Sequence, residues 1–283
     1  MTVEEIRVSS EWLHLREPAD AAARARDLAE HVRLCLPATG RRVIHDLASG
    51  TGAMGRWLAP LLPGPQHWVL HDRDGDLLEV AAARAPASAA DGASVAVETR
   101  WSDVTQLDQD DLAGATLITA SALLDLMTGD ELTGLIGACA GAGCPVLLTL
   151  SVTGQVDLAP ADPLDSRVAA AFDAHQRRMT GAGRLLGPDA VAAAAQEFRR
   201  LGAEVIVRPS PWQLGSAQAH LAAEWLTGWV GAACEQEAAL ATEADAYARR
   251  RLTEARAGGL HVTVGHADLL VLPGQSSSRS EPG

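Results

Sequence analysis

The amino-acid sequence predicts an α/β fold built around a largely parallel sheet. From Arg42 onward, short apolar runs alternate with helical tracts, and a helix between two strands is the connection that parallel strands require. The chain has 283 residues, of which 47% are apolar, so it can bury a large core. We therefore expect one α/β domain with additions.

The first 40 residues are expected to be helical. Pro18 stands where the first turn of a helix tolerates proline. Apolar residues then recur at the spacing of one helix face, and these are Ala21, Ala25, Leu28, Val32 and Leu36.

The alternating region follows. Strands are predicted at residues 43–47, 68–71, 95–101, 116–121 and 146–152. Helices are predicted between them, at residues 54–62, 74–85, 106–112 and 130–142. Beyond residue 152 the alternation loosens. The elements predicted there are helices at 164–179 and 188–201, a strand at 203–208, a helical tract at about 216–257 and a strand at 260–272 that is interrupted at Gly265.

Charge and composition exclude several classes of function. The formal net charge is −13 and the pI is about 5.1, whereas duplex nucleic acid is held by clustered Lys and Arg, so we expect no nucleic-acid partner. The sequence contains no Lys, which excludes a Walker A loop, a Schiff-base lysine and a Ser/Lys dyad. An acidic chain of this kind suits a small or cationic ligand better.

The four cysteines form no Cys-x-x-Cys pair, and we interpret them as buried free thiols of a cytoplasmic protein. The sequence shows no secretory leader and no apolar run of 18 residues. We therefore expect no membrane partner.

The stretch RRVIHDLASGTGAMGRWL contains the feature that indicates a ligand. Gly50-x-Gly52-x-x-Gly55 has the spacing of a dinucleotide fingerprint. In a nicotinamide-binding unit, however, the glycines follow the strand directly, so that the pyrophosphate meets the next helix. Here Asp46 ends the strand, four residues before Gly50. A carboxylate at that place repels phosphate and attracts an ammonium group.

At this point the sequence resembles the class I S-adenosylmethionine (SAM)-dependent methyltransferases. Asp46-x-Ala48-x-Gly50-x-Gly52 matches their first motif, an acidic residue followed by Gly-x-Gly-x-Gly, except that Ala48 replaces the first Gly. The resemblance implies that Asp46 meets the SAM amino group. It also implies that the backbone at Gly50 and Gly52 approaches the methionine part of SAM.

Three further stretches resemble the same family. In HWVLHDRDGDLLEVA, Asp72 ends the second strand, where a carboxylate can accept both ribose hydroxyls. In WSDVTQL, Asp103 takes the place of an acidic residue near the adenine amino group. In LITASALLDLMTGDEL, Ser121 takes the place of the small residue that ends the fourth strand. The SAM site implied by this resemblance consists of Asp46, Ala48, Ser49, Gly50, Gly52, Asp72, Arg73, Asp103, Val104 and Ser121.

The resemblance covers about residues 42–152 well and implies the fold of the whole chain. That fold is a Rossmann-like seven-stranded mixed sheet in the order 3-2-1-4-5-7-6, with helices on both faces. Residues 1–40 would form a helical lid, residues 41–272 the methyltransferase domain with a helical insertion at about 216–257, and residues 273–283 a disordered tail.

The resemblance also implies the reaction. SAM is the expected cofactor and S-adenosylhomocysteine (SAH) its product. We expect a small-molecule substrate, methylated on oxygen or nitrogen rather than carbon, and a monomer or homodimer. Two alternatives remain: an NAD-dependent oxidoreductase whose glycines bind pyrophosphate, and a SAM-fold protein with a non-methylating or binding-only role.

Two residues are predicted to take part in the chemistry. His175 follows the fifth strand, where the family often places substrate contacts, and would take a proton from the nucleophile. It also shares a helix face with Val168 and Phe172, so a packed core histidine is the alternative. Asp125 would orient the substrate, and its alternative role is to cap the following helix.

Two arginines and an i,i+4 pair also have two interpretations. Arg16 and Arg24 could reach the SAM carboxylate or pair with neighbouring acids. His220 and Glu224 stand four residues apart without a third ligand at a recognisable spacing, so we expect no metal.

Tryptophan dominates the few aromatic residues. Trp12 and Trp212 could form a pocket wall for an apolar substrate, whereas Trp225 and Trp229 are interpreted as helix packing.

Overall fold

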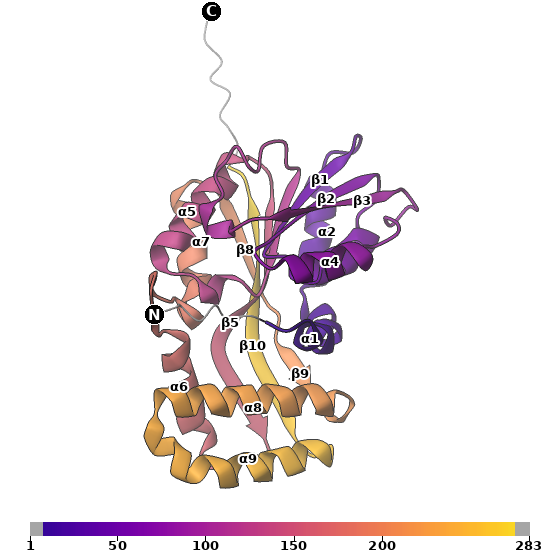
Figure 1. The fold of residues 1–283 in the computed structure, drawn as a ribbon. Coiled ribbons are helices and arrows are strands. Elements are labelled where there is room, and N and C mark those ends of the chain that lie inside the picture. Colours follow the sequence, from indigo (N-terminus) through magenta and orange to yellow (C-terminus); the bar gives the residue numbers. More distant parts are fainter. Residues whose placement is uncertain (1–7, 275–283) are drawn as a thin grey trace, which may run out of the picture.

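A computed structural model describes residues 8–274. Its core is an eight-stranded sheet in the order β3-β2-β1-β4-β5-β10-β8, with β9 paired to β10 outside this path (Figure 1). The strands of this sheet are β1 (Arg42–Leu47), β2 (Gln66–Asp72), β3 (Val95–Trp101), β4 (Leu117–Ser121), β5 (Val146–Ala159), β8 (Glu204–Pro209), β9 (Trp212–Leu214) and β10 (His261–Leu272). The first five run parallel, and β10 pairs antiparallel with both β5 and β8.

This order confirms the predicted sheet when β8 and β10 are counted as its sixth and seventh strands. It differs by the additional strand β9, which the sequence did not indicate. A two-residue hairpin, β6 (Met179–Thr180) with β7 (Gly183–Arg184), forms a second small sheet.

Two helical layers cover the sheet because its strands alternate apolar side chains between the faces. One face holds a core cluster with α2 (Arg26–Cys35), α3 (Ala53–Leu58) and α4 (Gly75–Ala83). The other face packs against α5 (Gly129–Gly141) and α7 (Ala190–Arg200). In β5, Leu147 contributes to the first cluster and Leu148 to the second, as the period of two in a strand requires.

The N-terminal region is helical, but as two helices. α1 (Ser10–Ala23) begins earlier than predicted, with Ser9 as its N-cap, so that Pro18 lies inside the helix and not in its first turn. The helical conformation is interrupted between α1 and α2, where the backbone N–H of Ala25 donates to Oδ2 of the buried Asp268, 2.8 Å away. This hydrogen bond fixes the junction of α1 and α2 against the last strand.

The predicted helix at 106–112 is wrong. The structure has a 3₁₀ turn at Val104–Gln106 and then further turns. Oδ1 of Asp108 accepts hydrogen bonds from the backbone N–H groups of Asp110 and Asp111, and such side-chain contacts compete with helix formation.

β5 and β10 continue past the parallel part of the sheet as a long antiparallel pair (Figure 1). Their register shifts between Val264 and His266, at the predicted interruption; a Cβ on Gly265 would lie 2.5 Å from Oγ1 of Thr153. This extension packs on α6 (Asp165–Gln176), α8 (Ala219–Gln236) and α9 (Ala241–Arg256), which share a third core cluster with it.

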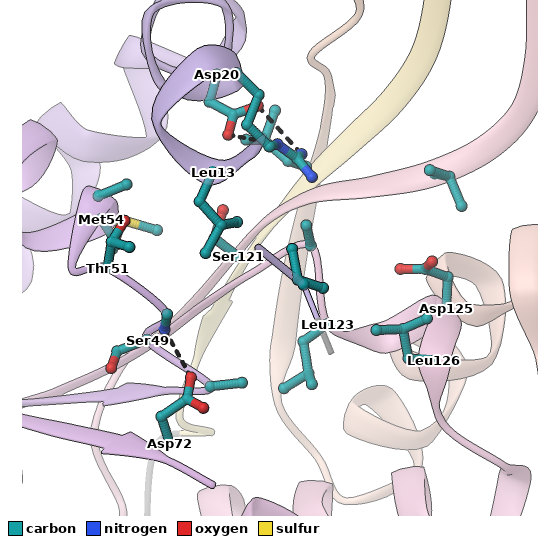
Figure 2. Close-up of a pocket in the computed structure, with 18 of the residues that line it drawn as sticks. Leu13, Asp20, Ser49, Thr51, Met54, Asp72, Ser121, Leu123, Asp125 and Leu126 are labelled. Atoms are coloured by element: carbon teal, nitrogen blue, oxygen red, sulfur yellow. Dashed lines mark hydrogen bonds and ion pairs between the residues drawn. The ribbon is translucent and has the colours of Figure 1, made fainter. Parts of the chain in front are cut away.

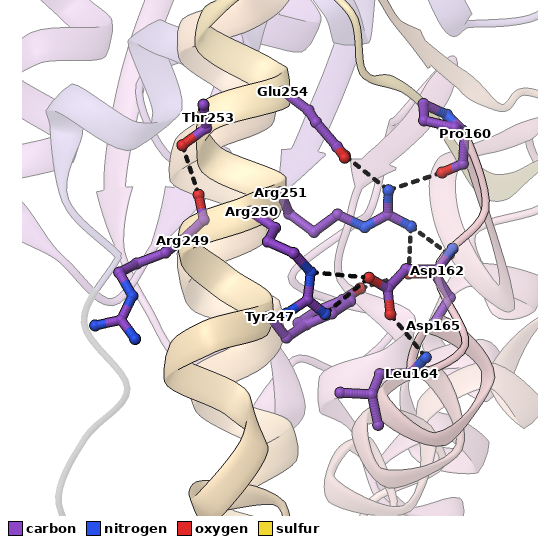
Figure 3. Close-up of polar contacts among 10 residues, drawn as sticks. All are labelled: Pro160, Asp162, Leu164, Asp165, Tyr247, Arg249, Arg250, Arg251, Thr253 and Glu254. Carbon is purple, nitrogen blue, oxygen red and sulfur yellow. Dashed lines mark hydrogen bonds and ion pairs between the residues drawn. The ribbon is translucent and has the colours of Figure 1, made fainter.

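A buried arginine joins α9 to the chain that follows β5 (Figure 3). Arg251 is 1% exposed and donates to the Asp165 carboxylate, to Glu254 and to the Pro160 carbonyl. The Tyr247 hydroxyl donates to the same Asp165, over 2.6 Å. The network therefore fixes the position of α9 relative to α6.

Within residues 8–274, none of the helices is both long enough and apolar enough to cross a membrane. The predicted tail lies largely outside this range, in residues 275–283.

Candidate functional site

A cavity of about 510 Å³ opens at the carboxyl ends of β1, β2 and β4, with α1 over it. Ligands of open α/β sheets bind at these strand ends. Figure 2 shows Ser49 and Asp72 on one side of this pocket and Asp125 and Leu126 on the other. We call the side with Ser49 and Asp72 the glycine side, and the side with Asp125 and Leu126 the Asp125 side (Figure 2).

The turn after β1 forms the glycine side. Ala48, Gly50 and Gly52 all have left-handed backbone angles, with φ of 51°, 52° and 78°. The turn is tied to β2 because the Ser49 N–H donates to the His71 carbonyl and the Gly50 N–H to Oδ2 of Asp72, 2.7 Å away. Gly52 lies outside the pocket lining; a Cβ there would approach the Cβ of Ala81 to 3.2 Å.

The left-handed Ala48 should cost stability, because its Cβ crowds the following carbonyl oxygen by roughly 1–2 kcal/mol. Ala48→Gly removes that crowding and loses part of the gain to backbone entropy. We expect the free energy of unfolding to rise by about 0.5–1 kcal/mol, measured by urea denaturation. Ala246→Gly is the control: this exposed site in regular helix α9 should lose about 1 kcal/mol. A loss at both positions would contradict the assigned strain.

Asp46 lies at the bottom of the glycine side and is 1% exposed. Its Oδ1 accepts a hydrogen bond from Oγ1 of Thr119 at 2.8 Å, whereas its buried Oδ2 has no partner within the described residues. Burial raises the pKa of this carboxyl group to about 7. An ammonium group in the pocket would complete its hydrogen bonding and favour the ionised form.

Arg24, at the junction of α1 and α2, extends into the same pocket and is 3% exposed. Nη2 donates to Oγ of Ser121 at 3.0 Å, and the guanidinium stacks over Trp57. Nη1 is buried and, within residues 8–274, has no hydrogen-bond acceptor. Burial lowers the pKa of Arg24, yet an arginine stays protonated in proteins. Arg24 thus presents a free cationic donor to the pocket.

The other arginine that the sequence left open, Arg16, is paired with an acid, and so is Arg56. Arg16 binds Asp20 through two hydrogen bonds of 2.9 and 3.2 Å, and Arg56 binds Glu17. Sequence alone did not separate Arg24 from them, because its burial depends on contacts with distant strands.

The remaining predicted cofactor residues also line the cavity. The oxygens of Asp72 accept the backbone N–H groups of Gly50 and Asp74, at 2.7 and 2.9 Å, which orients the carboxylate. Asp103 caps the 3₁₀ turn through the Thr105 N–H. The rest of this predicted set in the pocket is Ala48, Ser49, Arg73, Val104 and Ser121.

Of the two residues predicted to take part in the chemistry, Asp125 lies in the cavity and His175 does not. Asp125 lines the cavity in the 3₁₀ turn Leu124–Leu126, and burial raises the pKa of its carboxyl group. His175 is not among the lining residues; its Nε2 lies 3.1 Å from Oε2 of the exposed Glu235. The proposed role of His175 as a base therefore has no geometric support, because α6 directs its side chain to Glu235 of α8.

A histidine that the sequence did not single out does reach the pocket. His266 is 5% exposed, and its Nδ1 lies 3.0 Å from the Val264 carbonyl. A carbonyl can only accept, so Nδ1 carries the proton and Nε2 is left as an acceptor. Burial lowers the pKa of His266 to about 4, so the ring is neutral at pH 7. The only feature of the sequence that could have drawn attention to His266 is its position directly after Gly265, where the strand is interrupted.

Four aromatic side chains also line the cavity, and we call Trp12, Phe172, Trp212 and Trp225 the aromatic wall. Nε1 of Trp212 donates to Oδ1 of Asp20 at 2.9 Å. Trp225 lines the pocket and also stacks on Trp229, with ring centroids 5.1 Å apart, so packing and pocket formation coincide there.

His220 and Glu224 are exposed and 3.9 Å apart. Within residues 8–274, no group of three or more His, Cys, Asp or Glu side chains is placed to hold a metal ion.

The topology decides the fold family. An antiparallel strand, β10, lies between β5 and β8 at the end of an otherwise parallel sheet, and Asp46 and Asp72 end its first two strands. The fold is that of the class I methyltransferases. No protein-family model and no curated protein matches the sequence.

Solved structures with this fold resemble the chain at low identity. A cyclopropane synthase of Mycobacterium tuberculosis is 12% identical with a TM-score of 0.47, over 93% of this chain and 94% of the other. A SAM-dependent methyltransferase of Geobacter sulfurreducens in complex with SAH is 16% identical with a TM-score of 0.46, over 95% and 100%. A phosphoethanolamine N-methyltransferase of Haemonchus contortus is 12% identical with a TM-score of 0.45, over 93% and 57%. Likenesses at this level assign neither a substrate nor a catalytic residue.

Proposed function

We propose that the chain is a SAM-dependent methyltransferase that acts on a small molecule. One observation carries the proposal: Arg24 and Asp46 line one pocket, and each has a buried polar atom, the donor Nη1 and the acceptor Oδ2, without a hydrogen-bond partner among the described residues. The amino-acid part of SAM offers the complementary pair, a carboxylate and an ammonium group.

The other residues of the glycine side fit the rest of that cofactor. Asp72 would hold the ribose hydroxyls, and Asp103 lies at the end of β3 near the expected adenine. When bound, SAM supplies an electrophilic methyl group on a sulfonium. The residues of the chain then have to align the nucleophile with that methyl group and exclude water, which are large effects in such displacements.

The same geometry disfavours an NAD-dependent oxidoreductase. A pyrophosphate at the glycine turn would approach the carboxylates of Asp46 and Asp72, which repel it.

The aromatic wall and the size of the cavity support a small-molecule substrate with an apolar body, methylated on oxygen or nitrogen. We further propose that α1 forms the lid over the cofactor within the predicted segment of residues 1–40, whereas α2 packs on the sheet and does not line the pocket. We also propose that α8 and α9 are part of the main domain and not a separate unit. Their shared core cluster with β5 and β10 supports this. The four cysteines are free, but only Cys139 and Cys144 are buried as predicted; Cys35 is exposed and Cys234 part-buried. Their free thiols support a cytoplasmic location.

Thermal unfolding with added ligands tests the proposed function. A ligand that binds only the folded protein raises the unfolding temperature, and the rise grows with the logarithm of the ratio of ligand concentration to Kd. We expect SAH to raise it and NAD to leave it unchanged at the same concentration. A rise with NAD and none with SAH would overturn the proposal.

The raised pKa of Asp46 makes the binding of SAH depend on pH. Below about pH 7 the empty protein holds a proton on Asp46, which must leave before the carboxylate can bind the ligand's ammonium group. We expect the affinity to fall below pH 7, approaching tenfold per pH unit, in calorimetric titrations. Asp46→Asn should bind SAH weakly and without this pH dependence. An equal dependence in both proteins would show that another group titrates.

A further inference from the structure

The proposed cofactor contacts leave the Asp125 carboxylate without an assigned role. Figure 2 shows Asp125 across the pocket from Ser49 and Asp72, with its carboxylate directed into the pocket. Among residues 8–274 it forms no ion pair, and no other residue donates a hydrogen bond to its side chain; its only such contact is with its own backbone. The side chain is part-buried, and the Arg16 charge acts on it without a direct ion pair. A part-buried carboxylate without a direct partner is costly.

Three other charged residues of the pocket lining, outside the proposed cofactor contacts, are already satisfied. Arg16 and Asp20 form a bidentate pair, and Asp20 also accepts the Trp212 N–H. Glu131 accepts hydrogen bonds from the backbone N–H and the hydroxyl of Thr128, as part of a capping box. Asp125 is therefore the charge on this side that a ligand has to balance.

From this arrangement we infer that the substrate is an apolar amine, bound as its ammonium ion by the Asp125 carboxylate with its apolar body against the aromatic wall. Aromatic faces such as those of Trp12 and Trp225 also attract cations. An anionic substrate would leave Asp125 uncompensated, and an alcohol would not supply the opposite charge. The inference rests on the proposed function, in which it selects nitrogen as the methylated atom.

Methyl transfer to nitrogen gives Asp125 a second role, as the acceptor of a proton from the ammonium group. The ammonium group must lose one proton before its lone pair can attack, so one N–H bond breaks and one O–H bond forms on Asp125, giving the neutral amine and the neutral acid. The raised pKa of this carboxyl group favours that transfer. The lone pair then forms the nitrogen–carbon bond while the sulfur keeps the electrons of the broken carbon–sulfur bond.

Calorimetric titration with matched probes tests the inference. Benzylamine, 2-phenylethylamine and hexylamine are compared with benzyl alcohol, 2-phenylethanol and hexanol at pH 7, with and without saturating SAH. We expect at least one amine to bind about ten- to hundredfold more tightly than its alcohol. Asp125→Asn should abolish that preference and leave alcohol binding unchanged. Asp130→Asn, at an exposed acid in the first turn of α5, should retain the preference.

The inference is overturned if no amine binds more tightly than its alcohol, or if the preference survives Asp125→Asn. SAH binding is recorded in the same samples, so the two proposals fail separately. Asp125-dependent amine binding without SAH binding would overturn the cofactor and leave the amine site. SAH binding without an amine preference would overturn the amine site and leave the proposed cofactor.

Discussion

Arg24→Met is expected to weaken SAH binding by about 2–5 kcal/mol, roughly 30-fold to several thousandfold in Kd. The guanidinium is buried beside Ser121 and Trp57, Arg24 lines the cavity, and its Nη1 has no hydrogen-bond partner among the described residues. Without it, the carboxylate of the ligand would enter a pocket that already contains Asp46 and Asp72 and would find no compensating cation from this position. Calorimetric titration of SAH at pH 7.5 measures the effect.

The control is Arg26→Met, two residues along the chain at the exposed start of α2. It removes the same charge from the protein but none from the cavity, so SAH affinity should stay within about twofold, because exposed charges are screened. Circular dichroism checks that both variants fold. An equal loss of affinity in the two variants would show that overall charge, and not Nη1 of Arg24, governs binding.

Arg251→Met is expected to lower the free energy of unfolding by about 3–5 kcal/mol, because it breaks a buried ion pair and leaves one charge behind. The Asp165 carboxylate would keep only neutral donors, the Tyr247 hydroxyl and the Asp162 backbone N–H, and the Pro160 carbonyl would lose its Arg251 donor (Figure 3). Met preserves much of the apolar volume, so the loss reports on the polar contacts. Urea denaturation monitored by tryptophan fluorescence measures it.

The neighbouring Arg250 provides a matched control. It also pairs with an acid, Asp162 at 2.8 Å, but its side chain is 51% exposed. Exposed pairs contribute about 0–1 kcal/mol, so Arg250→Met should change stability little. If the two variants lost equal stability, burial would not be what makes the Arg251 network important.

The parallel part of the sheet was predictable from local sequence. The five predicted strands between residues 43 and 152 all form. Four of them are short apolar runs buried between two helical layers, whereas β3 lies at the edge of the sheet and is largely exposed. The extension of β5 to Ala159 was not predictable in this way. Residues 153–159 alternate between exposed and part-buried positions, and they pair with β10 about a hundred residues later in the chain.

The residues of the candidate site also fall into two groups, those that local sequence predicts and those that tertiary contacts bring into the pocket. Asp46, Gly50 and Asp72 were found because a strand, a turn and their spacing are local features of the sequence. Arg24 and His266 enter the pocket through tertiary contacts. The break that turns Arg24 inward is held by the hydrogen bond from Ala25 to Asp268, 243 residues away, and no local pattern reports such a contact.

Calorimetric titration of SAH, 5′-methylthioadenosine and NAD into one protein preparation tests the central claim most directly. The claim is that Asp46 and Arg24 recognise the amino-acid part of SAM. 5′-Methylthioadenosine keeps the adenine and ribose but lacks that part. We expect SAH to bind with one-to-one stoichiometry, 5′-methylthioadenosine to bind at least about tenfold more weakly, and NAD to give no binding heat. Binding of NAD with no heat from SAH would contradict the claim, as would equal affinities for SAH and 5′-methylthioadenosine.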